Sequence, residues 1–154
     1  MKTKAIVLTL TLILFTLGSA QAQIREETIL TYQVLTEEWD DLIAGALDLS
    51  EEEGASFWPL YEEYSKLKGA LWAERIDVIA MFLSGYDTMG AEIARGLLNA
   101  SFENEGKMLA LEREYADLFD DVIPLNKVVR LFQAENKLET TMMMEIAKDV
   151  PLAK

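Results

Sequence analysis

The sequence predicts an all-α protein of four helices, with a long antiparallel helical hairpin at its centre. Apolar residues recur at intervals of three and four along most of the chain, as they do on one face of a helix. Signals for strands are weak, and turn-forming residues occur in three short breaks at 45–50, 84–87 and 121–124. Three breaks leave four helical stretches.

The first helix is expected at 26–46. Its apolar stripe consists of four residues at helical spacing, Leu35, Trp39, Leu42 and Ala46. The second helix begins at a capping box, in which the Ser50 side chain caps the helix and Glu53 reaches back to the Ser50 amide. Pro59 removes one backbone hydrogen bond in an early turn, where we expect a kink.

Apolar residues of the second helix follow a seven-residue repeat that predicts a packing seam. The two seam positions hold Phe57, Tyr64, Leu71 and Val78, and then Leu60, Leu67, Glu74 and Met81. Glu74 interrupts the seam and is expected at its rim, paired with an arginine such as Arg95 or Arg113.

Asp87 or Thr88 is expected to cap the third helix. The matching seam of that helix consists of Leu97, Ser101, Asn104, Met108, Leu111, Tyr115, Leu118 and Val122.

The second and third helices are each about 34 residues, or roughly 50 Å, long. Because a four-residue break joins them, they are expected to pack as an antiparallel hairpin. The fourth helix begins at Leu125 or Asn126, directly after Pro124, and ends near Pro151. Its buried residues are expected to be Val128, Phe132, Leu138, Met142 and Ile146.

The N-terminus has the pattern of a cleavable export signal. Two lysines precede an apolar run at 5–17, and small residues allow cleavage after Ala22. The run is too short to cross the roughly 30 Å hydrocarbon core of a membrane as a helix, although an uncleaved anchor is the alternative. We expect 1–22 to be a signal peptide, 23–154 to be a single helical domain, and the mature protein to be periplasmic without membrane insertion.

Composition restricts the function. The chain has no cysteine and no histidine, which excludes a thiol nucleophile, an imidazole base, a Ser-His-Asp triad and a zinc site of the usual ligands. The formal charge of −13 opposes binding to nucleic acid and favours cationic or neutral partners, although acidic residues also serve solubility. No glycine-rich phosphate loop is present. We expect no cofactor, no metal and no enzymatic activity.

Two local patterns have simpler interpretations than catalysis or metal binding. Ser65 and Lys68 have the S-x-x-K spacing of serine acylating enzymes, but the companion motifs are missing and Lys68 is expected on a solvated face beside glutamates. Acidic residues at 48–54 suggest a calcium loop. However, Glu53 stands where such a loop needs glycine, and the capping box already explains this residue.

Large apolar residues outside the predicted seams form the candidate protein-binding surface. They are Trp58, Trp72, Met142, Met143 and Met144. The tryptophans lie beside the seam of the second helix, and three consecutive methionines point in three directions around the fourth, so they cannot all enter one core. Exposed aromatic and methionine side chains suit adaptable binding of apolar segments. A dimer interface or a thicker core is the alternative.

Three stretches resemble the periplasmic Spy/CpxP-like family of helical proteins. Leu-Ser-Glu-Glu-Glu at 49–53 is similar to the L-T-x-x-Q box of that family at a helix start. The stretches 57–64 and 132–138 are similar to F-W-P-x-Y and F-Q-x-E-N-K stretches of an uncharacterised branch. The resemblance implies a four-helix protomer that pairs into a curved homodimer and holds protein clients or a sensor domain. This chain is acidic where the best-known chaperones of the family are basic.

We therefore expect an exported, non-enzymatic interaction protein, which holds unfolded clients in a chaperone-like way or modulates an envelope-stress sensor. The alternative is a structural or assembly subunit whose helical face is buried in a homodimer or in a partner. Both expectations place the function in a surface rather than in a catalytic site.

Overall fold

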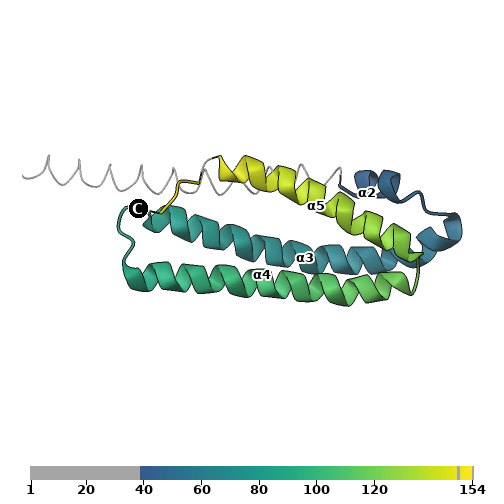
Figure 1. Cartoon of the computed structure of the whole chain (residues 1–154), viewed down its shortest axis with the longest axis horizontal. Coiled ribbons are helices and arrows are strands. Elements are labelled where there is room, and N and C mark those ends of the chain that lie inside the picture. Colours follow the sequence, from purple (N-terminus) through teal and green to yellow (C-terminus); the bar gives the residue numbers. More distant parts are fainter. Residues whose placement is uncertain (1–38, 149, 154) are drawn as a thin grey trace, which may run out of the picture.

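The computed structural model describes residues 39–148 and 150–153, which form four helices and contain no strand. In chain order the helices are α2 (Trp39–Leu47), α3 (Glu51–Gly85), α4 (Ala91–Asp120) and α5 (Leu125–Ala147). Figure 1 shows α3 and α4 as a long antiparallel hairpin, with α5 packed along it and α2 beside the start of α5. The predicted all-α class with a central hairpin is confirmed for this part of the chain. Within it, none of the helices is both long and apolar enough to cross a membrane.

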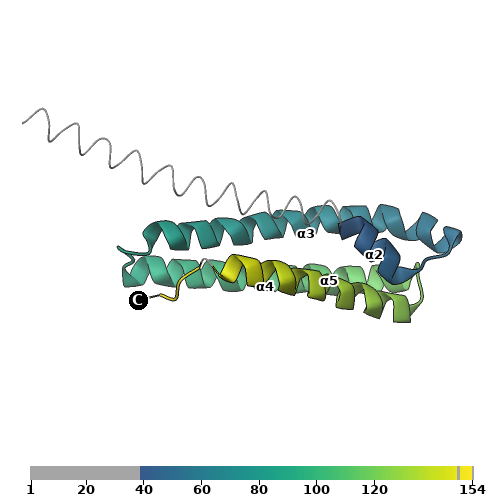
Figure 2. The ribbon, with the colours of Figure 1, turned by 90° about the horizontal axis from the view of Figure 1, so that it is seen from above.

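Only the end of the first predicted helix belongs to the described residues, and the predicted signal peptide at 1–22 and Leu35 lie outside them. In α2 the buried side chains are Ile43 and Leu47, whereas Leu42 is 50% exposed. The prediction of Leu42 as a core residue is wrong, because α2 packs against α5 through the neighbouring face. Figure 2 shows α2 lying between the first turns of α3 and α5.

The start of α3 is fixed by its predicted capping box. The Ser50 amide donates to Glu53 Oε2 at 2.7 Å, and the Glu53 amide donates to Ser50 Oγ at 3.3 Å. Lys127 of α5 reaches the same place, where its Nζ donates to Glu53 Oε2 at 2.8 Å and to the Asp48 carbonyl at 2.7 Å. The α2–α3 connection is thereby tied to the first turn of α5. Beyond it, α3 is continuous through Pro59.

The buried face of α3 differs from the predicted seven-residue repeat. Its large buried side chains are Phe57, Tyr61, Tyr64, Lys68, Trp72 and Ile76. Leu67 and Met81 were expected in the seam but are 44% and 51% exposed, so these two predictions are wrong. A straight helix drifts by about 20° per heptad, and α3 contacts α5 as well as α4, so its buried face is wider and turned toward both neighbours. Glu74 is exposed as predicted, but its ionic partner is Lys107 at 3.3 Å.

The predicted seam of α4 is largely confirmed. Asn104, Met108 and Tyr115 are buried, and the fourth buried residue is Phe119 rather than Leu118, which is 39% exposed. The helix begins at Ala91 with Gly90 at its N-cap, so the prediction of an Asp87 or Thr88 cap is wrong. Those two residues belong instead to the turn between α3 and α4.

The last helix begins at Leu125, as predicted, but ends at Ala147, before the expected Pro151. Val128 and Met142 are buried as expected, while Phe132, Leu138 and Ile146 are half-buried. Two buried residues of α5 were not predicted, namely Leu131 and Glu135.

The core consists of two apolar clusters along the hairpin. The first cluster joins α2, α3, α4 and α5 around aromatic rings, with Phe57 and Phe119 5.3 Å apart and Tyr64 and Tyr115 5.1 Å apart between ring centroids. The second cluster is smaller and consists of Trp72, Met108 and Met142, with Leu71, Met143 and Ile146 packed against them. On α3 the buried Lys68 stands between Tyr64 of the first cluster and Trp72 of the second.

Candidate functional site

The residues predicted to form a protein-binding surface do not lie on one surface. Trp72 is 4% exposed and Met142 is 1% exposed, and both belong to the second apolar cluster. The expectation that Trp72 lies beside the seam is wrong, because α5 covers this part of α3. Met143 is half-buried against the same cluster, so the structure brings three of the five residues together mainly as core.

The other two candidate residues lie apart from this group. Met144 is 63% exposed on α5. Trp58 is half-buried against the first cluster, where its ring meets Phe57 edge-on with centroids 5.0 Å apart. Of the five residues, Met144 is the most exposed.

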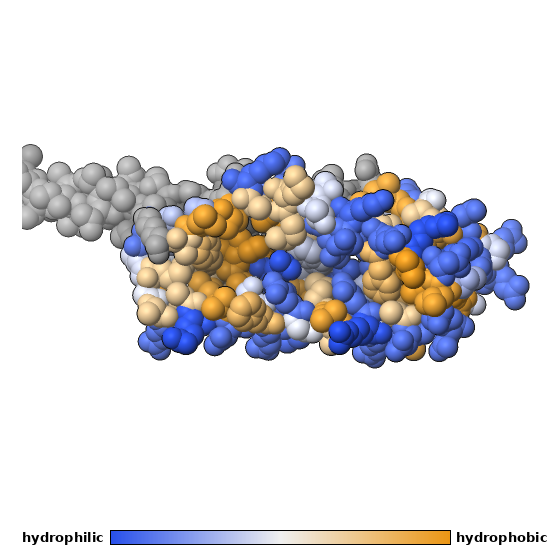
Figure 3. Space-filling view, in the orientation of Figure 1, coloured by the Kyte–Doolittle hydropathy of each residue, from blue (hydrophilic) through white to orange (hydrophobic). Residues whose placement is uncertain are grey.

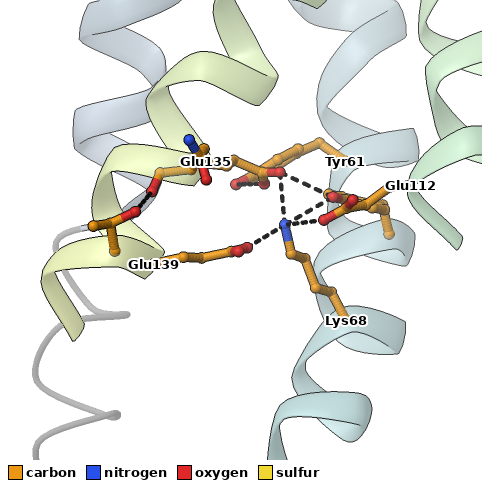
Figure 4. A network of polar contacts seen from close by, with 8 residues as sticks. Tyr61, Lys68, Glu112, Glu135 and Glu139 are labelled. Carbon is orange, nitrogen blue, oxygen red and sulfur yellow. Dashed lines mark hydrogen bonds and ion pairs between the residues drawn. The ribbon is translucent and has the colours of Figure 1, made fainter. Parts of the chain in front are cut away.

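A buried polar network lies between α3, α4 and α5 (Figure 4). Lys68 is 5% exposed, so the prediction of a solvated face for this residue is wrong. Its Nζ lies 2.9 Å from Glu135 Oε2 and 3.6 Å from Glu112 Oε1. Glu139 Oε1 contacts the same ammonium as an ion pair. One lysine therefore faces three carboxylates.

Two tyrosines complete the network. Tyr61 donates its hydroxyl hydrogen to Glu135 Oε1 at 3.2 Å, and Tyr64 donates to Glu135 Oε2 at 2.9 Å. Lys68 Nζ donates to Tyr64 Oη at 3.0 Å as well as to Glu135. The Glu135 carboxylate, whose side chain is 3% exposed, thus accepts hydrogen bonds from three buried donors. These donors compensate part of the cost of burying its charge.

The protonation states follow from burial and these contacts. Burial alone would lower the pKa of Lys68, but the carboxylates of Glu135 and Glu139 outweigh it and raise that pKa. Burial raises the pKa of Glu135, against the opposing effect of Lys68. Burial, together with the nearby Glu135 charge, raises the pKa of Tyr61 and of Tyr64. The lysine is accordingly protonated and both phenols are neutral at ordinary pH.

These states bear on the S-x-x-K pattern. A serine acylating site needs a lysine that can accept the proton of the serine hydroxyl. Lys68 is held in its protonated form by the carboxylates, so it cannot act as the base for Ser65. In the described part of the chain, no three histidine, cysteine or acidic side chains are arranged to hold a metal ion.

Sequence reasoning missed this network, although a signal for it exists. On α3, Lys68 follows Tyr61 and Tyr64 at helical spacing and continues the same face. On α5, Glu135 lies four residues after the buried Leu131. A lysine and a glutamate at seam positions of two helices indicate a buried ion pair only if the helices meet in that register, which the sequence does not specify.

A second feature is an apolar groove where α5 ends on the hairpin. It has a volume of about 200 Å³. Its apolar walls are Val78, Ile79, Met143, Ile146, Ala147 and Val150. Arg75 and Glu105 lie at its edge, with 4.0 Å between the guanidinium and the carboxylate. Asn104 lies at the groove as well and donates Nδ2 to the Leu71 carbonyl at 2.8 Å, while its buried Oδ1 has no hydrogen-bond partner among the described residues.

Figure 3 shows apolar surface gathered over the end of the molecule where α5 stops, on the left of the view. The groove lies at this end, because α5 ends at Ala147 and no longer covers the part of the α3–α4 hairpin that extends beyond it. The C-terminal segment contacts the hairpin near this end, where Tyr86 donates its hydroxyl hydrogen to the Leu152 carbonyl at 3.0 Å.

Comparison of the chain with protein-family models, with curated proteins and with solved structures finds no match in any of the three.

Removal of the buried ammonium is expected to destabilise the fold. Lys68→Ala leaves the Glu135 carboxylate buried beside Glu139 without a cation, and we expect a loss of about 3 kcal/mol in the free energy of unfolding. Lys66→Ala is the matched control, because Lys66 is exposed on the same helix and should change stability by less than about 0.5 kcal/mol. Urea unfolding followed by circular dichroism measures both. Equal effects of the two substitutions would show that the network does not support the fold.

Stability is expected to fall in alkaline solution. The pKa values of Tyr61, Tyr64 and Lys68 are raised from ordinary values of 10.0, 10.0 and 10.5, so the folded state keeps protons that the unfolded state loses. Their contribution is complete below about pH 10, and above it each group lowers the free energy of unfolding by about 1.4 kcal/mol per pH unit. Tyr64→Phe should reduce this slope by about one such increment. Urea unfolding between about pH 8 and about pH 11 tests this, and an unchanged slope in the variant would contradict it.

Proposed function

We propose that this chain is an exported, periplasmic, non-enzymatic interaction protein, which holds apolar segments of unfolded clients in the groove between α3, α4 and α5. A segment of an envelope-stress sensor is the other partner that suits such a groove. The observation that carries the proposal is the groove itself, with apolar walls from α3, from α5 and from Val150 after it, and with polar residues of α4 along its edge. The export-signal pattern and the resemblance to the Spy/CpxP-like family support the location and the class.

The dimensions of the groove suit one large apolar side chain. An engineered apolar cavity of about 150 Å³ holds a benzene molecule, and this groove measures about 200 Å³. A leucine or phenylalanine of a client therefore fits between Val78 and Met143. The flexible Met143 side chain adapts to different shapes, as is typical of surfaces that bind many segments.

The net charge of the chain determines which residues are expected beside the apolar segment of a client. The chain carries a net charge of −13, so basic residues flanking an apolar segment are attracted and acidic segments are repelled. The preferred client is thus an apolar stretch with lysine or arginine beside it. This preference is the opposite of that expected for the basic chaperones of the family that the sequence resembles.

Two neighbouring methionines provide a matched test of the groove. Met143 lines it, whereas the exposed Met144 does not. We expect Met143→Gln to weaken client holding about fivefold, because a polar amide replaces apolar contact surface, and Met144→Gln to leave it unchanged. The measurement is light scattering of reduced, aggregating insulin over a range of chaperone-to-client ratios. Absence of suppression by the wild-type protein at every ratio would refute client holding, and equal loss in both variants would refute the groove as its site.

The alternative, a structural subunit with one helical face buried in a homodimer, is favoured by a stripe on α4. Leu98, Phe102 and Leu109 are spaced by four and seven residues, which places them on one face, and they are 54%, 61% and 49% exposed. If this stripe pairs with a second copy, the wild-type protein should be a dimer and Phe102→Gln should be a monomer. Light scattering after size exclusion measures the mass. A wild-type monomer at all concentrations would exclude this alternative.

A further inference from the structure

A small cavity beside the buried network has an unusual lining. It has a volume of about 110 Å³ and lies between α2, α3 and α5. Its lining contains three aromatic side chains, one lysine and two carboxylates, which are Trp39, Tyr61, Trp72, Lys68, Asp40 and Glu135. Ser65 and Gly69 complete it. A second cavity of about 450 Å³ shares Asp40, Tyr61 and Ser65 with it and adds Trp58, Glu62 and Lys66. Neither cavity shares a residue with the apolar groove.

The charges around the smaller cavity favour a cation as its ligand. Lys68 is the single cation of its lining, and the contacts of that ammonium with Glu112, Glu135 and Glu139 more than offset its charge. Asp40 adds a further carboxylate, which is exposed and has no hydrogen bond or ion pair among the described residues. An anionic ligand would therefore meet an excess of carboxylates, whereas a cation would relieve their mutual repulsion.

One buried acceptor retains hydrogen-bonding capacity. Glu135 Oε2 accepts from Tyr64 and Lys68, but Oε1 accepts only from Tyr61, at 3.2 Å. Each carboxylate oxygen has about two acceptor positions, so Oε1 can accept another hydrogen. Glu135 is 2% exposed, which makes this a polar position fixed by the fold rather than a mobile surface carboxylate.

The aromatic lining distinguishes an organic cation from a metal ion. The faces of tryptophan and tyrosine attract ammonium groups, and the rings also contact the alkyl groups of such ligands. Arg75 already lies over the Trp72 ring, 5.4 Å from its centroid, and the Tyr61 ring stacks on Phe57 through one face, with centroids 5.3 Å apart. Trp39 and the other side of the Tyr61 ring are therefore assigned to a ligand. By comparison with an engineered cavity of about 150 Å³ that holds benzene, the smaller cavity, of about 110 Å³, has room for about four non-hydrogen atoms.

We infer that this cavity binds the head of an organic ammonium ion, with the Trp39 and Tyr61 rings around its alkyl groups and with Asp40 and Glu135 balancing its charge. Free alkylamines and the side chain of a lysine in a partner protein share this chemistry. The site is independent of the proposed client groove, so either can be absent without affecting the other.

Of the three tryptophans of the chain, Trp39 and Trp72 line the smaller cavity and Trp58 lines the larger one. Tryptophan fluorescence therefore reports binding. The test is a titration of the full chain with isopropylammonium chloride, with isopropanol as a neutral analogue of the same shape that also donates a hydrogen bond, and with sodium chloride as the ionic-strength reference. The expected result is a saturable change with isopropylammonium only. An equal response to isopropanol would indicate a cavity that does not select for charge, and an equal response to sodium chloride would indicate screening. Either result, or no saturable change, overturns the inference.

Adjacent aspartates give a matched pair of variants. Asp40 lines both cavities, whereas Asp41 is exposed on α2 and lines neither. Asp40→Asn should weaken isopropylammonium binding about fivefold, as expected for loss of one nearby charge, and Asp41→Asn should leave it unchanged. Trp39→Leu should also weaken binding about fivefold through loss of the ring. Equal effects of the two aspartate substitutions would show that overall acidity, rather than the cavity, attracts the cation.

Two further ligands distinguish the sources of the ammonium group. N-acetyl-lysine methylamide represents the side chain of a partner protein, and N-acetyl-norleucine methylamide is its uncharged control. Binding of the lysine derivative but not of the norleucine derivative assigns the cavity to a protein lysine. Binding of isopropylammonium alone assigns it to a free amine.

Discussion

The contact between Lys68 on α3 and Glu135 on α5 constrains the whole arrangement of helices. Both side chains are almost inaccessible to water, and separating them would leave a buried charge unpaired at a cost of several kcal/mol. A hydrophobic seam tolerates sliding and rotation better than such a pair does, because apolar contacts are not directional. The pair therefore favours one register of α5 on the hairpin, and the tyrosine hydroxyls that donate to Glu135 restrict this register further.

This register determines where the two candidate binding regions lie. With Glu135 opposite Lys68, α5 places Met142 against Trp72 and then ends at Ala147, while the hairpin continues. The uncovered walls beyond the second apolar cluster form the groove. The smaller cavity lies on the other side of Trp72, beside the ion pair of Lys68 and Glu135, and α2 contributes Trp39 to its lining. Both regions thus result from the same packing of α5, although they share no residue.

The network also restricts what chemistry the fold supports. Among the described residues, Lys68 is the buried lysine, and the carboxylates that surround it keep it protonated. Its neighbours Tyr61 and Tyr64 are kept neutral by burial and by Glu135. A fixed cation with neutral phenols provides structure and electrostatic complementarity rather than a base or a nucleophile. This is consistent with the proposed binding of apolar side chains in the groove and of ammonium groups in the cavity.

For the part of the chain that the structure describes, the sequence by itself determined the number of helices, the breaks between them and the capping box, because these depend on local backbone preferences and on helical periodicity. It did not determine which face of each helix is buried. Three of the errors are shifts by one residue: Ile43 is buried instead of Leu42, Lys68 instead of Leu67, and Phe119 instead of Leu118. The side chains of neighbouring residues point in directions about 100° apart around a helix. Which of the two is buried depends on where a third helix packs. Burial of Lys68 in particular depends on Glu135, which is distant in sequence and meets it only in the tertiary structure.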